Sequence, residues 1–238
     1  RSPVVVIEGL PGVGKSALAG AVVRSLDVRA LFPDGIWWLT VGQSADVADV
    51  QRRLLRSMGV HDERWQDADD RSRALVHRFF RRQALLVLDD VWSPEILEAF
   101  DVLSPLGRLL VTTRRAQDVV WSGVHPYRLE GHPVAAALKV LADHAGVAVD
   151  QLPAPAEGIV DLAEGIPLAL AAAGAQVRFG AGWQQVASSM QKAAAVFGPS
   201  PRSGALGAVL SSIRALEGTT GSVAGSRRPR PILLQVHG

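Results

Sequence analysis

The residues best suited to chemistry lie near the start of the chain, where residues 9–16 read Gly-Leu-Pro-Gly-Val-Gly-Lys-Ser. This is a complete G-x-x-x-x-G-K-[ST] phosphate-binding pattern. Its glycines lack a Cβ, so the backbone can wrap closely around a polyphosphate and direct N–H groups at it. Lys15 is expected to reach the β- and γ-phosphates, and the Ser16 hydroxyl to bind Mg²⁺. The predicted phosphate contacts are Gly9, Pro11, Gly12, Val13, Gly14, Lys15, Ser16 and Ala17.

Two acids form a second group of chemical interest, because they follow directly on the apolar run of residues 84–88. A buried strand of a parallel sheet delivers such residues to the edge where these sheets bind ligands. We expect Asp89 to hold Mg²⁺, mostly through water. We expect Asp90 to orient or deprotonate an attacking water molecule.

A third apolar run, residues 109–111, ends in Thr112, Thr113 and Arg114. The threonine hydroxyls can hydrogen-bond water or phosphate oxygens, and the Arg114 guanidinium is placed to sense or stabilise a γ-phosphate. The sequence therefore predicts Lys15, Asp90 and Arg114 as the catalytic side chains, with Ser16 and Asp89 as metal ligands.

Alternating short apolar runs and helical patterns position these residues over the first two-thirds of the chain. Such alternation is typical of a three-layer α/β domain, in which helices cover both faces of a parallel sheet. The predicted strands are Val4–Glu8, Gly35–Val41, Ala84–Asp89, Leu109–Thr113 and Tyr127–Leu129. The predicted helices are Ser16–Ser25, Ala45–Met58, Asp69–Arg82 and Pro94–Phe100, the third capped by Asp67 or Asp69.

A small all-helical domain is predicted to follow, because the apolar residues after residue 131 recur at helical spacing. Its predicted helices are Pro133–Ala145, Ala156–Glu164, Leu168–Phe179 and Trp183–Val196, with Gly146, Gly165, Gly180 and Gly198 at their ends. We place the α/β domain at residues 1–131 and the helical domain at 132–197. Residues 218–238 are aperiodic and turn-rich, which predicts a disordered tail.

Composition narrows the class of protein. The chain has 238 residues, a formal net charge of +2 and no cysteine, which excludes disulfides and thiol catalysis. Arg227, Arg228 and Arg230 lie in the last 22 residues against Glu217 alone, so charges of opposite sign balance in the rest. We therefore expect no nucleic-acid contact through this region. Without an apolar stretch of roughly 18 residues or a signal peptide, we expect a cytoplasmic protein with no membrane contact.

Four motifs together resemble a known family. GLPGVGKS, LLVLDDVW, LLVTTR and EGIPLAL occur in the order, and at about the spacing, of the NB-ARC domain, the P-loop NTPase module of STAND signalling proteins. The resemblance covers about residues 3–195, and residues 32–39 are similar to bacterial members. Residues 198–217 resemble only the start of the winged-helix region that normally follows, and His237 is no convincing substitute for its histidine.

The resemblance implies a switch that is off with ADP and on with ATP, with Mg²⁺ as cofactor. It implies that the nucleotide sits between the α/β and helical domains, in contact with Thr113 and Arg114. Arg114 then distinguishes ATP from ADP, Pro167 packs against the adenine, and Leu168 belongs to the same nucleotide site. It further implies effector or sensor partners and homo-oligomerisation in the ATP-bound form.

Other functions remain open on the sequence. A scaffold could keep ADP without hydrolysing anything, and a metabolic phosphotransferase could use the same loop. A DNA-binding regulator is a weaker alternative, because the body of the chain is neutral. We expect slow ATP hydrolysis that acts as a timer.

Overall fold

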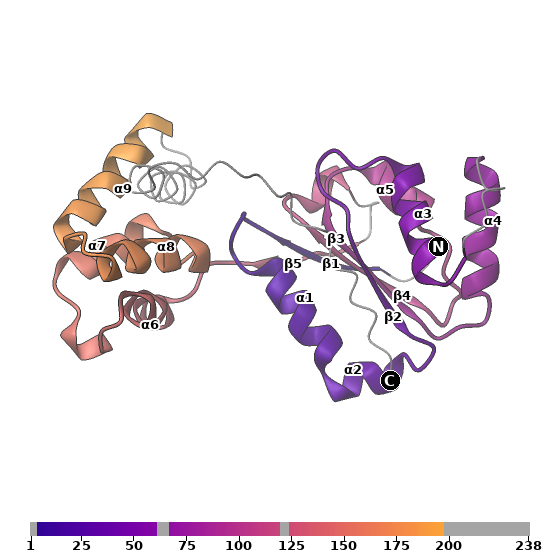
Figure 1. Cartoon of the computed structure of the whole chain (residues 1–238), viewed down its shortest axis with the longest axis horizontal. Helices are drawn as coiled ribbons and strands as arrows, with labels where there is room; N and C mark the ends of the chain where they lie inside the picture. The colour runs from indigo at the N-terminus through magenta and orange to yellow at the C-terminus, as the bar shows by residue number, and fades with distance from the viewer. Residues whose placement is uncertain (1–3, 61–66, 120–123, 198–238) are drawn as a thin grey trace. The chain divides into compact units, whose positions relative to one another are not determined.

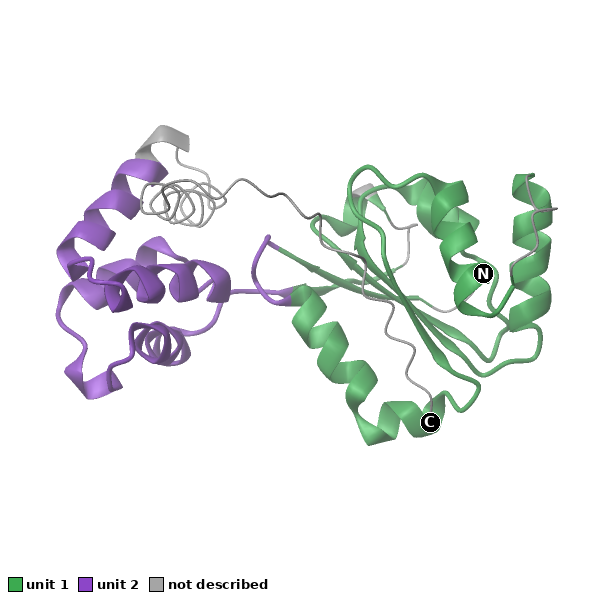
Figure 2. Ribbon diagram, viewed as in Figure 1, with its two compact units in different colours: residues 1–9, 15–128, 229–238 green, residues 10–14, 129–228 purple. Residues whose placement is uncertain are grey.

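The computed structural model describes residues 4–60, 67–119 and 124–197, which divide into two compact units (Figure 2). Within these residues the first unit comprises 4–9 and 15–128, and the second comprises 10–14 and 129–197. The middle of the phosphate-binding loop therefore groups with the second unit, although both of its flanks belong to the first. Predictions made for residues 198–238, including the winged-helix remnant, the tail and His237, lie outside the described residues.

A five-stranded sheet forms the centre of the first unit, in the order β2-β3-β4-β1-β5. The strands are β1 (Val4–Gly9), β2 (Ile36–Thr40), β3 (Leu85–Val91), β4 (Arg108–Thr113) and β5 (Tyr127–Leu129). The pairs β2–β3, β3–β4 and β4–β1 are all parallel. Since β4 lies between β1 and β3, the strand that leads into the loop and the strand that ends in two acids are not neighbours.

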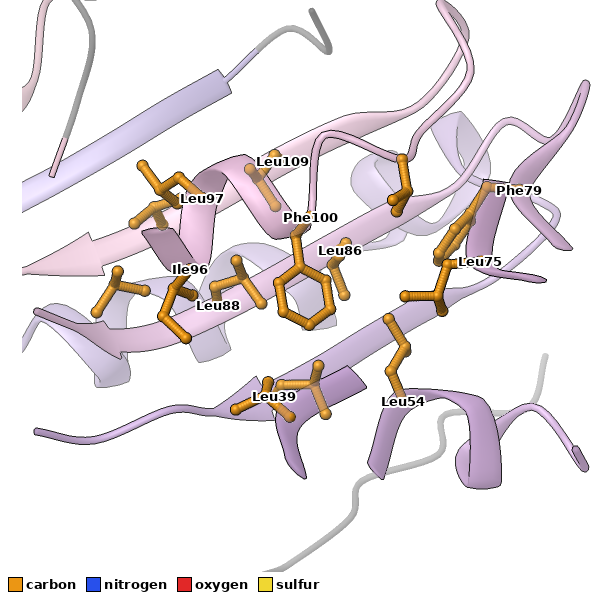
Figure 3. Close-up of a cluster of buried hydrophobic side chains, with 14 of the residues drawn as sticks. Leu39, Leu54, Leu75, Phe79, Leu86, Leu88, Ile96, Leu97, Phe100 and Leu109 are labelled. Atoms are coloured by element: carbon orange, nitrogen blue, oxygen red, sulfur yellow. The ribbon is translucent and has the colours of Figure 1, made fainter. Parts of the chain in front are cut away.

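Helices pack on both faces of this sheet (Figure 1). Those of the first unit are α1 (Lys15–Arg24), α2 (Leu26–Leu31), α3 (Val47–Ser57), α4 (Ala68–Phe79) and α5 (Pro94–Ala99), with a short 3₁₀ turn η1 (Ala116–Asp118). Side chains alternate along β3: Leu86 and Leu88 join the cluster formed with α3, α4 and α5 (Figure 3), whereas Leu85 and Val87 are buried outside it. Residues 85–88 of the strand are all apolar because both faces of the sheet are covered.

After β5, the described residues of the second unit form helices joined by loops and turns. It contains α6 (Val134–Ala145), α7 (Pro155–Leu162), α8 (Pro167–Arg178) and α9 (Trp183–Phe197), with a 3₁₀ turn η2 (Val149–Gln151). Their buried side chains, among them Leu141, Ile159 and Leu170, form a separate apolar cluster. Gly146, at the end of α6, adopts a left-handed φ of 75°, as predicted for a helix-ending glycine.

The predicted α/β fold with a following helical part is confirmed, and the differences are local. The helix predicted to reach Arg82 ends at Phe79, because the next residue, Phe80, leaves the helical region with a ψ of 123°, and Arg81 then has a left-handed φ of 57°. Asp67 is its N-cap, and the carboxylate accepts a 2.9 Å hydrogen bond from the Asp69 N–H. Helix α2 was not predicted, because it buries none of its residues and so has no amphipathic pattern.

Candidate functional site

The carboxylate of Asp89 is the centre of the candidate site. Its Oδ1 accepts a 2.7 Å hydrogen bond from the Ser16 hydroxyl, at the start of α1, and a 2.6 Å bond from the Thr112 hydroxyl on β4. Asp89 is only 7% exposed. Strand β4 lies between β1 and β3. Thr112 on β4 therefore joins the Asp89 carboxylate on β3 to the strand that pairs with β1. The structure therefore brings together the two predicted metal ligands, Ser16 and Asp89.

A bulge at the end of β3 gives the two adjacent acids different partners. The register with β4 moves from Leu88 opposite Val111 to Val91 opposite Thr113, so Asp89 and Asp90 together face a single β4 residue. Asp90 adopts a left-handed φ of 59°, a conformation that aspartate tolerates better than most residues. Its N–H donates to the Thr112 hydroxyl over 2.9 Å. Bulges of this kind re-aim side chains next to functional sites.

Lys15 is buried and lies against its own loop. Its ammonium donates a 2.9 Å hydrogen bond to the Gly9 carbonyl. Lys15 as a whole is 9% exposed. Burial lowers the pKa of Lys15 below its usual 10.5, and the nearby Arg114 cation lowers that pKa further, against the opposing effect of Asp90 and Asp89. Two cations close together around a phosphate-binding loop favour an anionic ligand.

Arg114 follows β4 and is held from two sides. Its Nε lies 3.9 Å from Asp90 Oδ1, and its guanidinium carbon lies 4.2 Å from the centre of the Trp92 ring. The side chain is 43% exposed, so part of it remains accessible to a ligand. The neighbouring Thr113 is buried and donates a 2.8 Å hydrogen bond to the Val91 carbonyl, which ties β4 to β3. Direct contact of Thr113 with a nucleotide stays a prediction.

The middle of the loop, which belongs to the second unit, is held by helix α8. The N–H of Leu168, in the first turn of α8, donates a 3.4 Å hydrogen bond to the Gly12 carbonyl. N–H groups in a first helical turn have no partner within the helix, so this contact satisfies one of them. Gly12 has a φ of 77°, and a Cβ placed there would lie 2.8 Å from the Leu168 Cβ. Glycine is therefore required at residue 12 for two independent reasons.

The remaining predicted contacts have less specific surroundings. Pro167 is half-buried at the start of α8, and Pro11 is half-buried in the loop. Val13 is 4% exposed and anchors the loop, whereas Ala17 is exposed in the first turn of α1. Gly14 has a φ of 107°, which favours glycine. Their contact with a nucleotide stays a prediction.

The chemistry of the donor set fits Mg²⁺. Ser16 and Asp89 offer a hydroxyl and a carboxylate oxygen 2.7 Å apart, and Mg²⁺ prefers oxygen ligands. In the part of the chain that the structure describes, no three histidine or acidic side chains gather as a metal-binding group. Magnesium typically takes one or two protein ligands and completes its shell with water and substrate phosphates, so such a small set is sufficient.

Two contacts in this site were not anticipated from the sequence. Thr112 was expected to bond water or phosphate, but its hydroxyl bonds Asp89 and accepts from Asp90. Trp92 had no predicted role, and the structure places its ring under Arg114. The available signal was its spacing, because Trp92 stands two residues after Asp90 and alternate residues of an extended segment point the same way.

Comparison with known proteins shows the family of this chain. Residues 1–125 match the NB-ARC domain, and the chain belongs to this family. It is 36% identical over 192 residues to the apoptotic protease-activating factor 1 of Danio rerio, covering 73% of this chain and 15% of that protein. It is 35% identical over 118 residues to the probable disease resistance RPP8-like protein 4 of Arabidopsis thaliana, covering 47% of this chain and 13% of that protein.

A solved structure supports the fold alone. The Walker-type ATPase of Pyrococcus abyssi has a TM-score of 0.51 and 11% identity, over 92% of this chain and 71% of that one. The chain spans 15% of the length of the Danio rerio relative and 13% of the Arabidopsis thaliana relative. Across the described residues, no helix combines the length and apolarity needed to cross a membrane.

Proposed function

We propose that this chain is the nucleotide-binding core of a signalling switch that binds ADP or ATP with Mg²⁺ and hydrolyses ATP slowly. The observation that carries the proposal is the Ser16–Asp89–Thr112 hydrogen-bonded cluster, with Lys15 and Arg114 close enough to each other to interact electrostatically. Family membership supports the nucleotide as ligand. The bacterial character suggested by residues 32–39 stays a prediction.

Each side chain has a distinct role in this proposal. Lys15 leaves the Gly9 carbonyl and binds the β- and γ-phosphates, which gives its buried charge an anionic partner. Ser16 and Asp89 hold Mg²⁺, which when bound neutralises charge on the phosphate oxygens. Arg114 binds the γ-phosphate and is therefore the group that distinguishes a triphosphate from a diphosphate.

Hydrolysis assigns a role to Asp90. The oxygen of a water molecule attacks the γ-phosphorus, the bond from that phosphorus to the bridging oxygen breaks, and ADP and inorganic phosphate leave. Asp90 orients the water and accepts its proton. The ion pair at 3.9 Å between Asp90 and Arg114 holds the carboxylate near the group that binds the γ-phosphate.

The signalling output is a change of conformation, which requires a difference in binding free energy between the two nucleotides. Inverting a two-state switch from 1:99 to 99:1 requires the triphosphate to favour one state by about 5.5 kcal/mol. A γ-phosphate contact to Arg114, together with the Mg²⁺ that Ser16 and Asp89 would hold, would supply a large share of this difference. In this proposal the protein acts with effector or sensor partners, and it self-associates in the ATP-bound form.

The first test is to denature the purified protein and identify any released nucleotide by chromatography, then to titrate ADP and ATP with Mg²⁺. Stoichiometric ADP, or micromolar binding by the nucleotide-free protein, supports the proposal. Acceptor-independent ATP loss identifies a slow ATPase. Loss that depends on an acceptor identifies a phosphotransferase, and binding without any loss identifies a scaffold.

Three variants sharpen this test. Lys15→Ala is expected to abolish tight binding, whereas Lys192→Ala, which removes an exposed lysine of α9, leaves it unchanged. Asp90→Asn keeps the left-handed backbone and is expected to bind nucleotide normally but to lose hydrolysis. Unchanged ADP affinity in the Lys15 variant would contradict the phosphate-loop assignment.

A further inference from the structure

Arg114 is held by two groups that belong to one short segment. Asp90 and Trp92 both contact its guanidinium group, with the Nε 3.9 Å from Asp90 Oδ1 and the guanidinium carbon 4.2 Å from the ring centre. Val91, between them, is 1% exposed and joins the apolar cluster under α3 and α5. The buried Val91 therefore fixes the segment, and its two neighbours are presented together to Arg114.

The two contacts constrain Arg114 in different ways. A carboxylate at 3.9 Å attracts the charge but leaves the plane of the guanidinium free to turn. An aromatic ring sets that plane, because a guanidinium stacks flat on an aromatic face and Trp has the strongest quadrupole of the aromatic side chains. The Asp90 contact competes with a phosphate for the charge, whereas the Trp92 contact leaves the N–H groups at the edge of the guanidinium free to donate.

The indole nitrogen of Trp92 shows that the ring is not anchored by its polar atom. Trp92 Nε1 is buried and has no hydrogen-bond partner in the described ranges 4–60, 67–119 and 124–197. Buried Trp N–H groups usually find a partner, so a ring in this position is held through its faces and edges. One of those faces carries Arg114.

We propose that Trp92 is the positioning residue of Arg114, and that by fixing the guanidinium plane it sets the preference of the site for a triphosphate over a diphosphate. The inference rests on the proposed function, because it assigns Arg114 to the γ-phosphate. It gives Trp92, a half-buried residue two positions after Asp90, a role in distinguishing the two nucleotides.

The test compares the affinities of a non-hydrolysable ATP analogue and of ADP, each with Mg²⁺, in the full chain and its Trp92→Leu variant. A cation–π contact at a partly exposed site corresponds to about a two- to fivefold change in affinity. We expect the affinity of the variant for the ATP analogue to fall by that factor, while its affinity for ADP stays unchanged. Equal losses for both nucleotides would overturn the proposal, because they would indicate only a packing role.

A double-mutant cycle adds a readout that a packing role does not move. In the Arg114→Ala background, Trp92→Leu should have no further effect on the ratio of the two affinities. The adjacent exposed arginine gives a matched control, because Arg115→Ala should leave the effect of Trp92→Leu intact. An undiminished effect of Trp92→Leu in the Arg114→Ala background would refute the coupling.

A second measurement keeps the test decisive if Trp92→Leu does not fold. The emission of Trp92 is obtained as the difference between the wild-type chain and Trp92→Phe, and it should change with the analogue but not with ADP. An unchanged emission on saturation with the analogue counts against the proposal. If the wild-type chain binds neither nucleotide, the proposed function itself fails, which is distinct from binding without any effect of Trp92.

Discussion

At the scale of single residues, the site depends on one carboxylate oxygen shared by two hydroxyl groups. Asp89 Oδ1 accepts from both Ser16 and Thr112, and the Thr112 oxygen accepts in turn from the Asp90 N–H. Thr112 is fully buried, whereas Ser16 is exposed. Water can replace Ser16 if it is removed, but it cannot reach Asp89 as easily from the Thr112 side.

Thr112→Val is therefore expected to destabilise the first unit. The change keeps the shape of the side chain but removes a donor to a buried carboxylate and the acceptor of a backbone N–H, at a cost of about 1–3 kcal/mol. The free energy of unfolding in urea measures the loss. Ser16→Ala is the control, and it should cost less because its site is open to solvent. Equal costs for the two variants would contradict the difference in burial.

The charge of Lys15 predicts how nucleotide binding depends on pH. The pKa of Lys15 is lowered in the free protein by burial and by Arg114, and a bound phosphate raises that pKa again. As pH rises through the lowered pKa, binding must take up a proton, so nucleotide affinity should fall at a pH below 10.5. Isothermal titration across alkaline pH measures this.

Lys15→Arg provides the control for this pH dependence, since a guanidinium stays protonated over the whole range. Its affinity should be weaker at neutral pH, because the compact ammonium fits the loop better, but should not fall in the same alkaline window. A parallel fall in both proteins would assign the titration to another group.

At the scale of elements, the joint between α7 and α8 depends on close contact between backbones. The His132 N–H donates a 2.8 Å hydrogen bond to the Gly165 carbonyl. Gly165 has a φ of 65°, and a Cβ at this position would collide with the His132 carbonyl. Gly131 likewise faces the Glu164 carbonyl. The segments that lead into α6 and α8 therefore meet backbone to backbone, with Gly131 in one and Gly165 in the other.

Gly165→Ala is expected to destabilise the second unit, because both the left-handed backbone and the collision oppose a side chain. The cost should be about 1–3 kcal/mol or more for the strained conformation alone. Gly158→Ala is the matched control: this residue lies within α7 and a Cβ there would meet open space. That change should stabilise the helix by about 0.5–1 kcal/mol. Thermal unfolding followed by circular dichroism distinguishes the opposite signs.

At the scale of the whole molecule, the described residues bury two separate apolar clusters that share no residue. One lies between the sheet and the helices α3, α4 and α5, and the other lies among α6, α7, α8 and α9. Each cluster belongs to one compact unit. Units with their own cores can unfold as separate cooperative steps.

Matched truncations in the two clusters test this separation. Leu88→Ala and Leu141→Ala each remove a fully buried leucine, one from each cluster, and each should cost about 2–5 kcal/mol. In calorimetry of the nucleotide-free chain, each variant should lower one transition and leave the other in place. A shift of both transitions by either variant would instead indicate a single cooperative unit.

The sequence by itself determined the order of the elements, the parallel α/β class and the residues available for chemistry. These follow from local patterns: continuous apolar runs such as Leu85–Leu88, the helical spacing after residue 131, and the glycines of residues 9–14. Periodicity and turn chemistry act over a few residues, so one chain is enough to recognise them. Helix α2 was not predicted because none of its residues is buried, so it has no apolar pattern to recognise.

Only the tertiary structure decided how these residues meet. The insertion of β4 between β1 and β3, which makes Thr112 the link to Asp89, is a property of strand order. The bulge that separates the partners of Asp89 and Asp90 depends on the register between two strands. The contact between the Arg114 guanidinium and the Trp92 ring joins segments 22 residues apart. Such contacts depend on the packing of distant segments, which local sequence patterns do not encode.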